Sequence, residues 1–263
     1  MSFFTASGIT AGYKQQPVLR DLSFELSAGS ITGLLGANGS GKTTLLKAIC
    51  GMIPHSGTCT LNGTVLENLT AKQLAALCSY IPQRSGISID ISALDVVLMG
   101  FNPQLRLLEQ PNDAMKEKAR QALALVGLKD REHTNYLHFS EGQKQLCILA
   151  RTLAANSSLL LLDEPESALD FHYRYHMLEL LQQWIHSKER GALITLHDPT
   201  LALNYCDRIL LLSDGQIIGT LSPRLDPLLQ MEELLQTIYG PVSLQLCQNR
   251  SGQEQLVLLR ERS

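Results

Sequence analysis

The sequence has almost no charge excess and no long apolar run. Lys and Arg number 22 and Asp and Glu 25, which gives a net charge of −3 over 263 residues. A chain this close to neutral has no bulk attraction for nucleic acid or for an acidic membrane, although it leaves room for local basic patches. We predict no nucleic-acid partner. The apolar runs stay below the roughly 18 to 20 residues that cross a bilayer. Residues 1–5 lack the basic and apolar segments of a signal peptide.

The cysteines and most of the histidines form no recognisable metal or redox motif. None of the six cysteines belongs to a C-x-x-C pair, so neither zinc binding nor thioredoxin-like chemistry is predicted, and we expect reduced, mostly buried thiols. His172 and His176 are four residues apart on a predicted helix. Without a third ligand, they favour an ordinary helix face over a metal site. The sequence offers no defensible constellation for His55, His133, His138 and His186.

Strand and helix patterns alternate along the chain. The hydrophobic content of 44% and the charged content of 18% are those of a folded globular protein. Alternating β and α elements favour a mostly parallel sheet. The strand-like segments are 19–33 (with a turn at 27–29), a hairpin at 58–66 around Asn62-Gly63, 77–82, 159–162, 192–196 and 208–212. The helix-like segments are 42–50, 113–126, 141–155, 171–188 and 200–206.

The composition shifts at about Gln83, where helical periodicity replaces short strands. We expect one domain over residues 1–263, with a helical subdomain inserted at about 84–150. A short helix and a β-hairpin are expected in the tail, at about 231–263, with the turn around residues 249–252. The 44% hydrophobic residues suffice for a sizeable core in a chain of this length.

A phosphate-binding motif follows a predicted strand and opens a predicted helix. Gly36-Ala37-Asn38-Gly39-Ser40-Gly41-Lys42-Thr43 fits G-x-x-x-x-G-K-[ST] in full. Its glycines let successive backbone N–H groups point at one anion, and the helix N-terminus adds its positive end. Lys42 is placed to reach the β- and γ-phosphates, and the Thr43 hydroxyl to bind Mg²⁺. The alternative, a glycine turn with a chance lysine, does not explain the strand–loop–helix setting.

Two adjacent carboxylates follow the leucine run at residues 159–162. In open α/β sheets, ligands bind at the carboxyl ends of the strands. Asp163 is therefore placed to hold Mg²⁺, through water, and Glu164 to polarise the attacking water as a general base. An Asp-Glu pair alone equally describes a solvated loop, but its place downstream of a phosphate loop favours the catalytic reading.

The sequence resembles the ABC-type ATPases along nearly its whole length. Phe139-Ser140-Glu141-Gly142-Gln143 is similar to the family signature L-S-G-G-Q, which separates this family from other P-loop proteins. A GTPase is not supported, because no N-K-x-D motif is present. The other matching positions are Tyr13 (adenine stacking), Gln83 (Mg²⁺ and water), Ser167-Ala168-Leu169-Asp170 (the D-loop) and His197 (γ-phosphate).

The resemblance implies a fold and a set of site residues. The fold is α/β, the P-loop ABC ATPase fold, with a mostly parallel core sheet, an antiparallel β subdomain and an inserted helical subdomain. ATP and Mg²⁺ are the implied cofactors. The implied catalytic residues are Glu164, His197 and Gln83, and the implied Mg²⁺ residues are Thr43, Gln83 and Asp163. The implied nucleotide-binding residues are Tyr13, Gly36, Asn38, Gly39, Ser40, Gly41, Lys42, Thr43 and Thr44.

The signature motif implies a head-to-tail homodimer. A serine and backbone N–H groups before a helix make a second anion site. In the family, this site contacts the γ-phosphate held by the other subunit, so two ATP molecules lie between two chains. We therefore expect Ser140, Glu141, Gly142 and Gln143 to act on the partner's ATP, with Asp170 in the adjoining D-loop.

Two residues depart from the family pattern. Glu141 stands where glycine is usual, and a carboxylate near a triphosphate is unfavourable. We expect the cost to be small if its side chain points away from the nucleotide, since Ser140 and Gly142 are intact. Glu166 stands where threonine or serine is usual, and the sequence does not predict its effect.

Subgroup features resemble the importers of iron–siderophore, haem and vitamin B12. They are the segment 93–100, the run Leu196-His197-Asp198-Pro199, the later Cys206-Asp207-Arg208, and the tail from Ile238. This resemblance implies an ATPase at the cytoplasmic face of the inner membrane, with an integral permease and, indirectly, a substrate-binding protein as partners. The permease contact is expected between Gln83 and Phe101, although Leu98, Met99 and Phe101 are equally well explained as core residues.

Two other functions remain open from the sequence. A soluble ABC protein of DNA repair or translation usually has paired ATPase units or long coiled-coil insertions, for which 263 residues leave no room. A hydrolysis-poor, regulatory ATP-binding protein is suggested by Glu141, whereas Gln83, Glu164 and His197 together argue against it.

Overall fold

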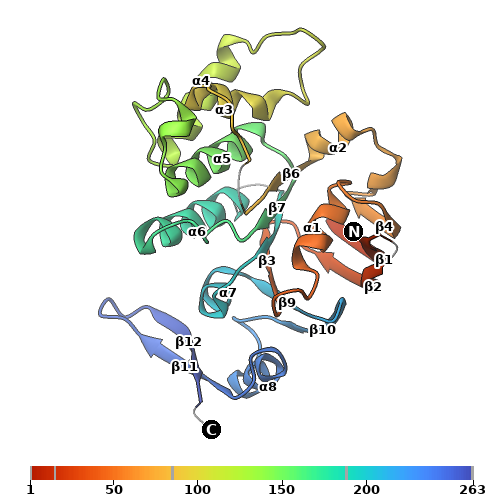
Figure 1. The fold of residues 1–263 in the computed structure, drawn as a ribbon. Helices are drawn as coiled ribbons and strands as arrows, with labels where there is room; N and C mark the ends of the chain where they lie inside the picture. Colours follow the sequence, from red (N-terminus) through yellow and green to blue (C-terminus); the bar gives the residue numbers. More distant parts are fainter. Residues whose placement is uncertain (1, 15, 84–85, 187–188, 262–263) are drawn as a thin grey trace.

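Parallel strands form the centre of the molecule, as the alternation of strands and helices predicts (Figure 1). This computed structural model describes residues 2–14, 16–83, 86–186 and 189–261. The neighbouring strands β10 and β9 are antiparallel, and the other pairs of this core sheet are parallel. The sheet order is β10 (Gln216–Leu221), β9 (Arg208–Ser213), β3 (Ser30–Leu35), β8 (Gly191–Thr195), β7 (Leu159–Asp163) and β6 (Cys78–Ile81).

Strand β7 shows why the run 159–162 is continuously apolar. All four leucines have no exposed surface. Leu160 and Leu162 belong to one hydrophobic core, and Leu159 and Leu161 belong to a second core across the sheet. Because successive side chains of a strand point to opposite faces, a strand covered on both sides needs apolar residues at every position.

A second, antiparallel sheet packs beside helix α1 at the right of Figure 1. The predicted hairpin is confirmed as β4 and β5, which meet at Asn62-Gly63. Strand β1 was not predicted, because a register shift between Ala6 and Ile9 interrupts its alternation. The sheet order is β2 (Gln16–Leu26), β1 (Phe4–Tyr13), β4 (His55–Leu61) and β5 (Thr64–Val65).

The predicted helices are confirmed to within a few residues at their ends, and the end of the fourth, at Lys188, lies outside the described residues. They are α1 (Lys42–Ile49), α4 (Asp113–Leu125), α5 (Glu141–Ala155), α6 (Phe171–His186) and α7 (Pro199–Tyr205). Helices α2 (Ala71–Leu77) and α3 (Ala93–Leu98) were not predicted, nor were the short 3₁₀ turns η1 (Leu66–Asn68), η2 (Met99–Phe101) and η3 (Tyr136–His138).

Helices α3, α4 and α5 pack on one another at the top of Figure 1. Phe101 and Tyr136 are among the largest side chains buried there. Treating residues 84–150 as an inserted subdomain of a single domain stays a prediction, and its first residue, Arg84, lies outside the described residues.

The chain ends in α8 (Leu228–Tyr239) and the hairpin of β11 (Val242–Gln248) and β12 (Glu254–Arg260). The side chain of Asn204 in α7 donates to the carbonyl of Leu256 at 2.8 Å and accepts from its N–H at 3.0 Å. The hairpin is thereby fixed to the core. No helix of the described chain is long and apolar enough to span a membrane.

Candidate active site

The loop between β3 and α1 has the backbone shape of an anion cradle. Gly39 and Gly41 have φ angles of +82° and +109°, which side chains other than glycine rarely adopt. At Gly36 the requirement is steric, since a Cβ would lie 2.3 Å from the carbonyl oxygen of Leu212. Helix α1 then begins at Lys42, so the unpaired N–H groups of its first turn point into the loop.

Lys42 lies across this loop. Its Nζ donates to the carbonyls of Gly36 at 2.8 Å and Ala37 at 3.2 Å. Burial lowers the pKa of Lys42, while the charges of Glu164 and Asp163 act in the opposite direction. The ammonium is therefore held near two carboxylates, at the place where a phosphate would face the loop.

Asp163 is buried at the end of β7, where three hydroxyl groups bond to it. Thr43 Oγ1 and Thr195 Oγ1 donate to Oδ1 at 3.1 Å and 3.0 Å, and the Tyr80 hydroxyl donates to Oδ2 at 3.2 Å. Burial, followed by the Asp163 charge, raises the pKa of Tyr80. The helix that follows the phosphate loop and the β7 carboxylate are thus joined directly, which brings the two predicted Mg²⁺ residues Thr43 and Asp163 together. Sequence reasoning missed Tyr80 and Thr195, because neither belongs to a motif.

Glu164 begins the next loop in a left-handed conformation, with φ +47°. Its N–H donates to Thr195 Oγ1 at 2.8 Å, which holds this backbone. Its Oε2 accepts from Gln83 Nε2 at 2.7 Å and lies 3.5 Å from His197 Nε2. Three side chains predicted from separate parts of the sequence therefore meet at one carboxylate oxygen.

These groups line a cavity of about 510 Å³ beside the phosphate loop. One lining residue, Val18 of β2, was not predicted, because it is apolar and belongs to no motif. The lining residues are Val18, Asn38, Gly39, Gly41, Lys42, Thr43, Thr44, Gln83, Glu164 and His197.

Other predicted residues lie outside the lining of this cavity. Tyr13, at the end of β1, is 47% exposed, an open position for an aromatic ring that would stack on a base. The hydroxyl of Ser40 is buried and has no hydrogen-bond partner among the described residues. Gly36 begins the loop and Asp163 ends β7, and neither lines the cavity.

The signature residues and Asp170 do not line the cavity of their own chain. Ser140 caps α5: its Oγ accepts from the N–H of Gln143 at 3.2 Å, and the Gln143 side chain accepts from the N–H of Ser140. A Cβ on Gly142 would lie 3.3 Å from the carbonyl oxygen of Ala168, so this turn packs against the D-loop. Asp170 Oδ1 accepts from the N–H of Tyr173 at the start of α6.

Glu141 forms an ion pair that the sequence analysis did not anticipate. Its Oε1 lies 2.7 Å from Lys144 Nζ, one turn along α5, and its side chain is 71% exposed. An acidic residue in the first turn of a helix also interacts favourably with the helix dipole. The carboxylate thus has a partner within its own helix.

Glu166, the second departure, is 2% exposed. Its Oε1 accepts from the backbone N–H of His197 at 2.9 Å, while Oε2 is buried and has no partner among the described residues. Burial raises the pKa of this carboxyl, and the bond from His197 opposes that shift. Glu166 therefore holds the backbone of His197 and does not line the cavity.

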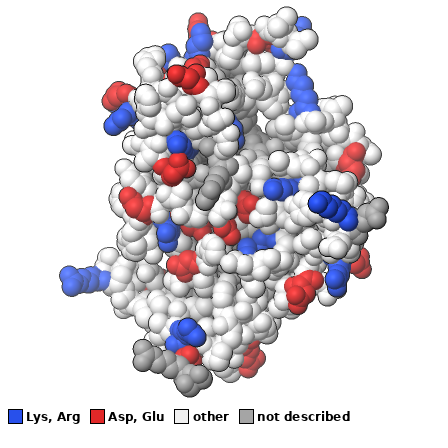
Figure 2. Space-filling model, in the orientation of Figure 1, with Lys and Arg blue, Asp and Glu red and all other residues white. Residues whose placement is uncertain are grey.

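Lys, Arg, Asp and Glu are interspersed over the face of the molecule in Figure 2. This face shows no continuous basic area of the kind that follows a nucleic-acid backbone. That the chain has no nucleic-acid partner stays a prediction.

Comparison with known proteins identifies the family. Residues 19–167 match the family model described as ABC transporter. The chain is 34% identical over 244 residues to the hemin import ATP-binding protein HmuV of Bordetella pertussis, covering 89% of this chain and 91% of that protein. It is 35% identical over 207 residues to the manganese transport system ATP-binding protein MntB of Bacillus subtilis, covering 78% and 80%.

The fold is shared along the whole chain. A solved structure described as a metal-chelate type ABC transporter in an inward-facing conformation is similar with a TM-score of 0.82 and 26% identity, covering 99% of both chains. A dimeric ATP-binding cassette bound to ADP and phosphate has the same fold, with a TM-score of 0.76 at 22% identity. The expected α/β ABC ATPase fold is therefore confirmed, and this chain belongs to the ABC transporter family as an ATP-binding, ATP-hydrolysing cassette.

Proposed function

We propose that this chain is the ATP-hydrolysing subunit of a bacterial importer for an iron–siderophore, haem or corrinoid cargo. The observation that carries the ATPase role is the meeting of Gln83, Glu164 and His197 beside a complete phosphate loop. The importer role is supported by relatives named for hemin and manganese transport and by a structural neighbour of metal-chelate type. The chain itself works at the cytoplasmic face of the inner membrane.

Each group of the cavity has a proposed role. The loop N–H groups and Lys42 bind the β- and γ-phosphates. Glu164 takes a proton from the attacking water, and the nearby His197 contacts the γ-phosphate. Tyr13 stacks on the adenine from the end of β1. The short contact between Gln83 and Glu164 opens when a nucleotide and its water enter between them.

The oxygen donors at the base of the cavity fit Mg²⁺, a hard cation that prefers oxygen ligands. Thr43 Oγ1 and Asp163 Oδ1 are 3.1 Å apart, and the Gln83 amide oxygen is the third donor. We propose that these residues hold the ion, Asp163 through water. When bound, Mg²⁺ neutralises charge on the β- and γ-phosphate oxygens.

A second copy completes the site. The signature residues 140–143 and Asp170 lie outside the cavity of their own chain. Facing the ATP of the partner, the N-terminus of α5 supplies the second anion site. ATP binding then closes the dimer, and hydrolysis removes the bridging γ-phosphate and lets it open.

Only the exposed residues of the range 83–101 can contact the permease. Leu98 and Phe101 are 9% and 2% exposed, so they are core residues, whereas Ile89 is 55% exposed. Arg84 and Ser85 lie outside the described residues. Residues 86–90 are therefore the surface that we expect to meet a cytoplasmic segment of the permease.

A tagged pull-down from native membranes in mild detergent, with mass spectrometry, tests the proposal. We expect a polytopic permease at equal stoichiometry, and its substrate-binding protein then identifies the cargo. Ile89→Glu should abolish this capture, while Leu107→Glu, at a 94% exposed position outside residues 83–101, should not. Recovery only from the soluble fraction would contradict the importer role and favour a soluble ABC ATPase.

A further inference from the structure

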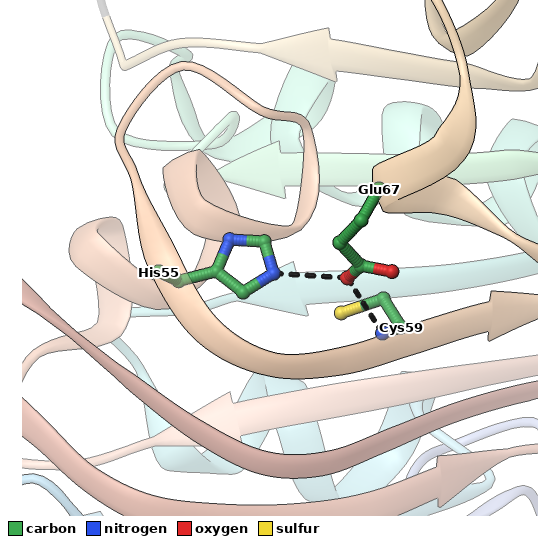
Figure 3. Close-up of side chains that lie close together, drawn as sticks. All are labelled: His55, Cys59 and Glu67. Atoms are coloured by element: carbon green, nitrogen blue, oxygen red, sulfur yellow. Dashed lines mark hydrogen bonds and ion pairs between the residues drawn. The ribbon is translucent and has the colours of Figure 1, made fainter.

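A second group of chemically active side chains lies in the antiparallel sheet, apart from the nucleotide cavity. His55, Cys59 and Glu67 point toward one another (Figure 3). The His55 Nε2 atom is 3.0 Å from Glu67 Oε1, and one donor atom from each residue lies within 4.8 Å of the others. Among the residues described, no other such group of three His, Cys, Asp or Glu was found, and His172 and His176 lack a third ligand.

The local fold explains why these residues meet. His55 and Cys59 are four residues apart on β4, and the side chains of both approach Glu67. Asn62 and Gly63 have φ angles of +48° and +78°, which allow the tight turn into β5. The chain then enters η1, which carries Glu67 back over β4. The spacing H-x₃-C-x₇-E is no known metal motif, so the sequence alone did not reveal the group.

The donor atoms suit zinc. Nitrogen, sulfur and carboxylate oxygen are the three ligand types that Zn²⁺ takes in proteins, at about 2.0 to 2.3 Å. Ligands at those lengths around a tetrahedral ion are roughly 3 to 4 Å apart. The observed separations, from 3.0 Å to at most 4.8 Å, need only small side-chain rotations to reach that geometry. Mg²⁺ and Ca²⁺, which prefer oxygen ligands, do not suit a set with sulfur and nitrogen.

The group is largely shielded from water but not sealed. Cys59 is 1% exposed, and the His55 and Glu67 side chains are 9% and 28% exposed. His55 lines one surface cavity of about 340 Å³, and Glu67 lines another of about 390 Å³. An ion can therefore reach His55 and Glu67 from the surface.

We propose that His55 Nε2, Cys59 Sγ and a Glu67 carboxylate oxygen form a zinc site. In the metal-free chain, Glu67 Oε1 accepts hydrogen bonds from the His55 ring and from the Cys59 backbone N–H, at 3.0 Å and 2.7 Å. When zinc binds, the Cys59 S–H bond breaks, its proton passes to solvent, and the sulfur electron pair binds the ion. At His55 the proton that Nε2 donates to Glu67 leaves that nitrogen and a proton is taken up at Nδ1, a change of tautomer with no net loss, so that the Nε2 lone pair binds the ion.

The metal-free thiol is protonated at neutral pH. Burial, together with the charge of Glu67, raises the pKa of Cys59 to about 12. The ion would tie η1 to β4, and β4 pairs with β1 at Ala11, two residues before Tyr13. The site would thus stiffen the sheet from which the proposed adenine contact extends.

Cobalt titration of the metal-free full chain, without ATP, tests the site. A thiolate bound to Co²⁺ gives a near-ultraviolet charge-transfer band, and Zn²⁺ displaces the cobalt. We expect one equivalent per chain in the unmodified protein and in the control variant Cys247→Ala, which removes an exposed thiol. Cys59→Ala should lose the band. His55→Ala and Glu67→Gln should weaken binding at least about 10-fold, whereas His133→Ala, at an 82% exposed side chain, should not.

Several results would overturn the site: no band in the unmodified chain, an equal band in Cys59→Ala, or loss of the band in Cys247→Ala. Circular dichroism establishes that each variant is folded. If Cys59→Ala does not fold, Glu67→Gln decides the question, because its partly exposed side chain is replaced without loss of volume. Metal binding is measured without turnover, so the outcome is independent of the proposed importer role.

Discussion

Glu166 Oε1 accepts a hydrogen bond from the backbone N–H of His197 at 2.9 Å. This bond joins the loop after β7 to the loop after β8. It fixes the backbone of a residue whose ring reaches to 3.5 Å from Glu164. Glu166 is therefore a positioning residue for His197, although it does not line the cavity.

Removing this acceptor should impair turnover. Glu166→Ala leaves the His197 N–H without its partner, at a cost of about 1 to 3 kcal/mol. We expect kcat for ATP hydrolysis to fall roughly 10-fold on that basis, with little change in KM, since the phosphate loop is untouched. Glu166→Gln keeps an acceptor oxygen and should retain most of the activity. Wild-type kcat in Glu166→Ala would rule out the positioning role.

The same carboxyl should make stability depend on pH. Its pKa is raised in the folded chain, chiefly by burial, above the ordinary 4.5. Its contribution is therefore fully present below that ordinary pKa and is lost as the pH rises through the folded value. Glu166→Gln does not titrate, so its Tm relative to wild type should increase from about pH 4 to pH 8. A relative Tm that decreases over this range in thermal scans would contradict the shift.

Glu164→Gln should separate binding from hydrolysis. The amide has nearly the shape of the carboxylate but cannot take a proton from water. We expect kcat to fall at least about 100-fold, while binding of a fluorescent ATP analogue stays within a few-fold. Thr195, which fixes the Glu164 backbone, is unchanged in this variant. Unchanged turnover would refute Glu164 as the general base.

The ion pair of Glu141 and Lys144 should limit the effect of the unusual signature residue. The two groups are 2.7 Å apart, and because the Glu141 side chain is 71% exposed, the pair is worth little in stability. Glu141→Gly should change the hydrolysis rate only modestly, within about 3-fold. In the proposed dimer, Lys144→Met leaves the Glu141 carboxylate unpaired near the partner's ATP, and it should raise KM more than Glu141→Gly does.

The double variant completes this test. Glu141→Gly combined with Lys144→Met should recover most of the KM lost in Lys144→Met alone. A higher salt concentration should reduce the increase in KM that Lys144→Met causes, because salt screens the charge of Glu141. A rise in the hydrolysis rate of several orders of magnitude in Glu141→Gly would mean that the natural signature supports little hydrolysis. That result would favour a regulatory role for this ATP-binding protein.

Two glycines of the phosphate loop should differ in their tolerance of alanine. At Gly36 the added Cβ meets the Leu212 carbonyl oxygen at 2.3 Å, and this oxygen belongs to backbone that cannot rotate away. At Gly39 the Cβ meets nothing within 4 Å, and the cost is only the positive φ, about 1 to 2 kcal/mol. Gly36→Ala should have a lower Tm than Gly39→Ala, and it should bind nucleotide more weakly. Equal stability of the two variants would refute the steric requirement.

Elements with a regular pattern were predictable from the sequence, and irregular ones were not. Helix α5 has an N-cap at Ser140 and a continuous apolar face, so its predicted bounds match. Strand β1 was missed because the shift between Ala6 and Ile9, where Gly8 has φ +65°, breaks the two-residue period. Helix α2 was missed because it buries no residue, although Thr70 and Gln73 form a capping box.

The site was predictable where function demands fixed spacing. Lys42 and Glu164 stand in motifs whose chemistry sets the sequence, and the structure brings them to one cavity. Tyr80 and the partners of Glu166 depend on distances in three dimensions, which no spacing encodes. The i, i+3 spacing of Glu141 and Lys144 on a predicted helix, by contrast, was a signal for their ion pair. Glu67 approaches His55 only because a hairpin folds back over β4.

The separation of the signature residues from the cavity of their own chain has a genetic consequence. On the proposed dimer, a chain with a damaged Lys42 and a chain with a damaged Ser140 are each inactive when paired with themselves. The mixed pair concentrates both lesions in one composite site and leaves the other intact. Two recessive loss-of-function alleles, one in each motif, should therefore complement each other when expressed in the same cell.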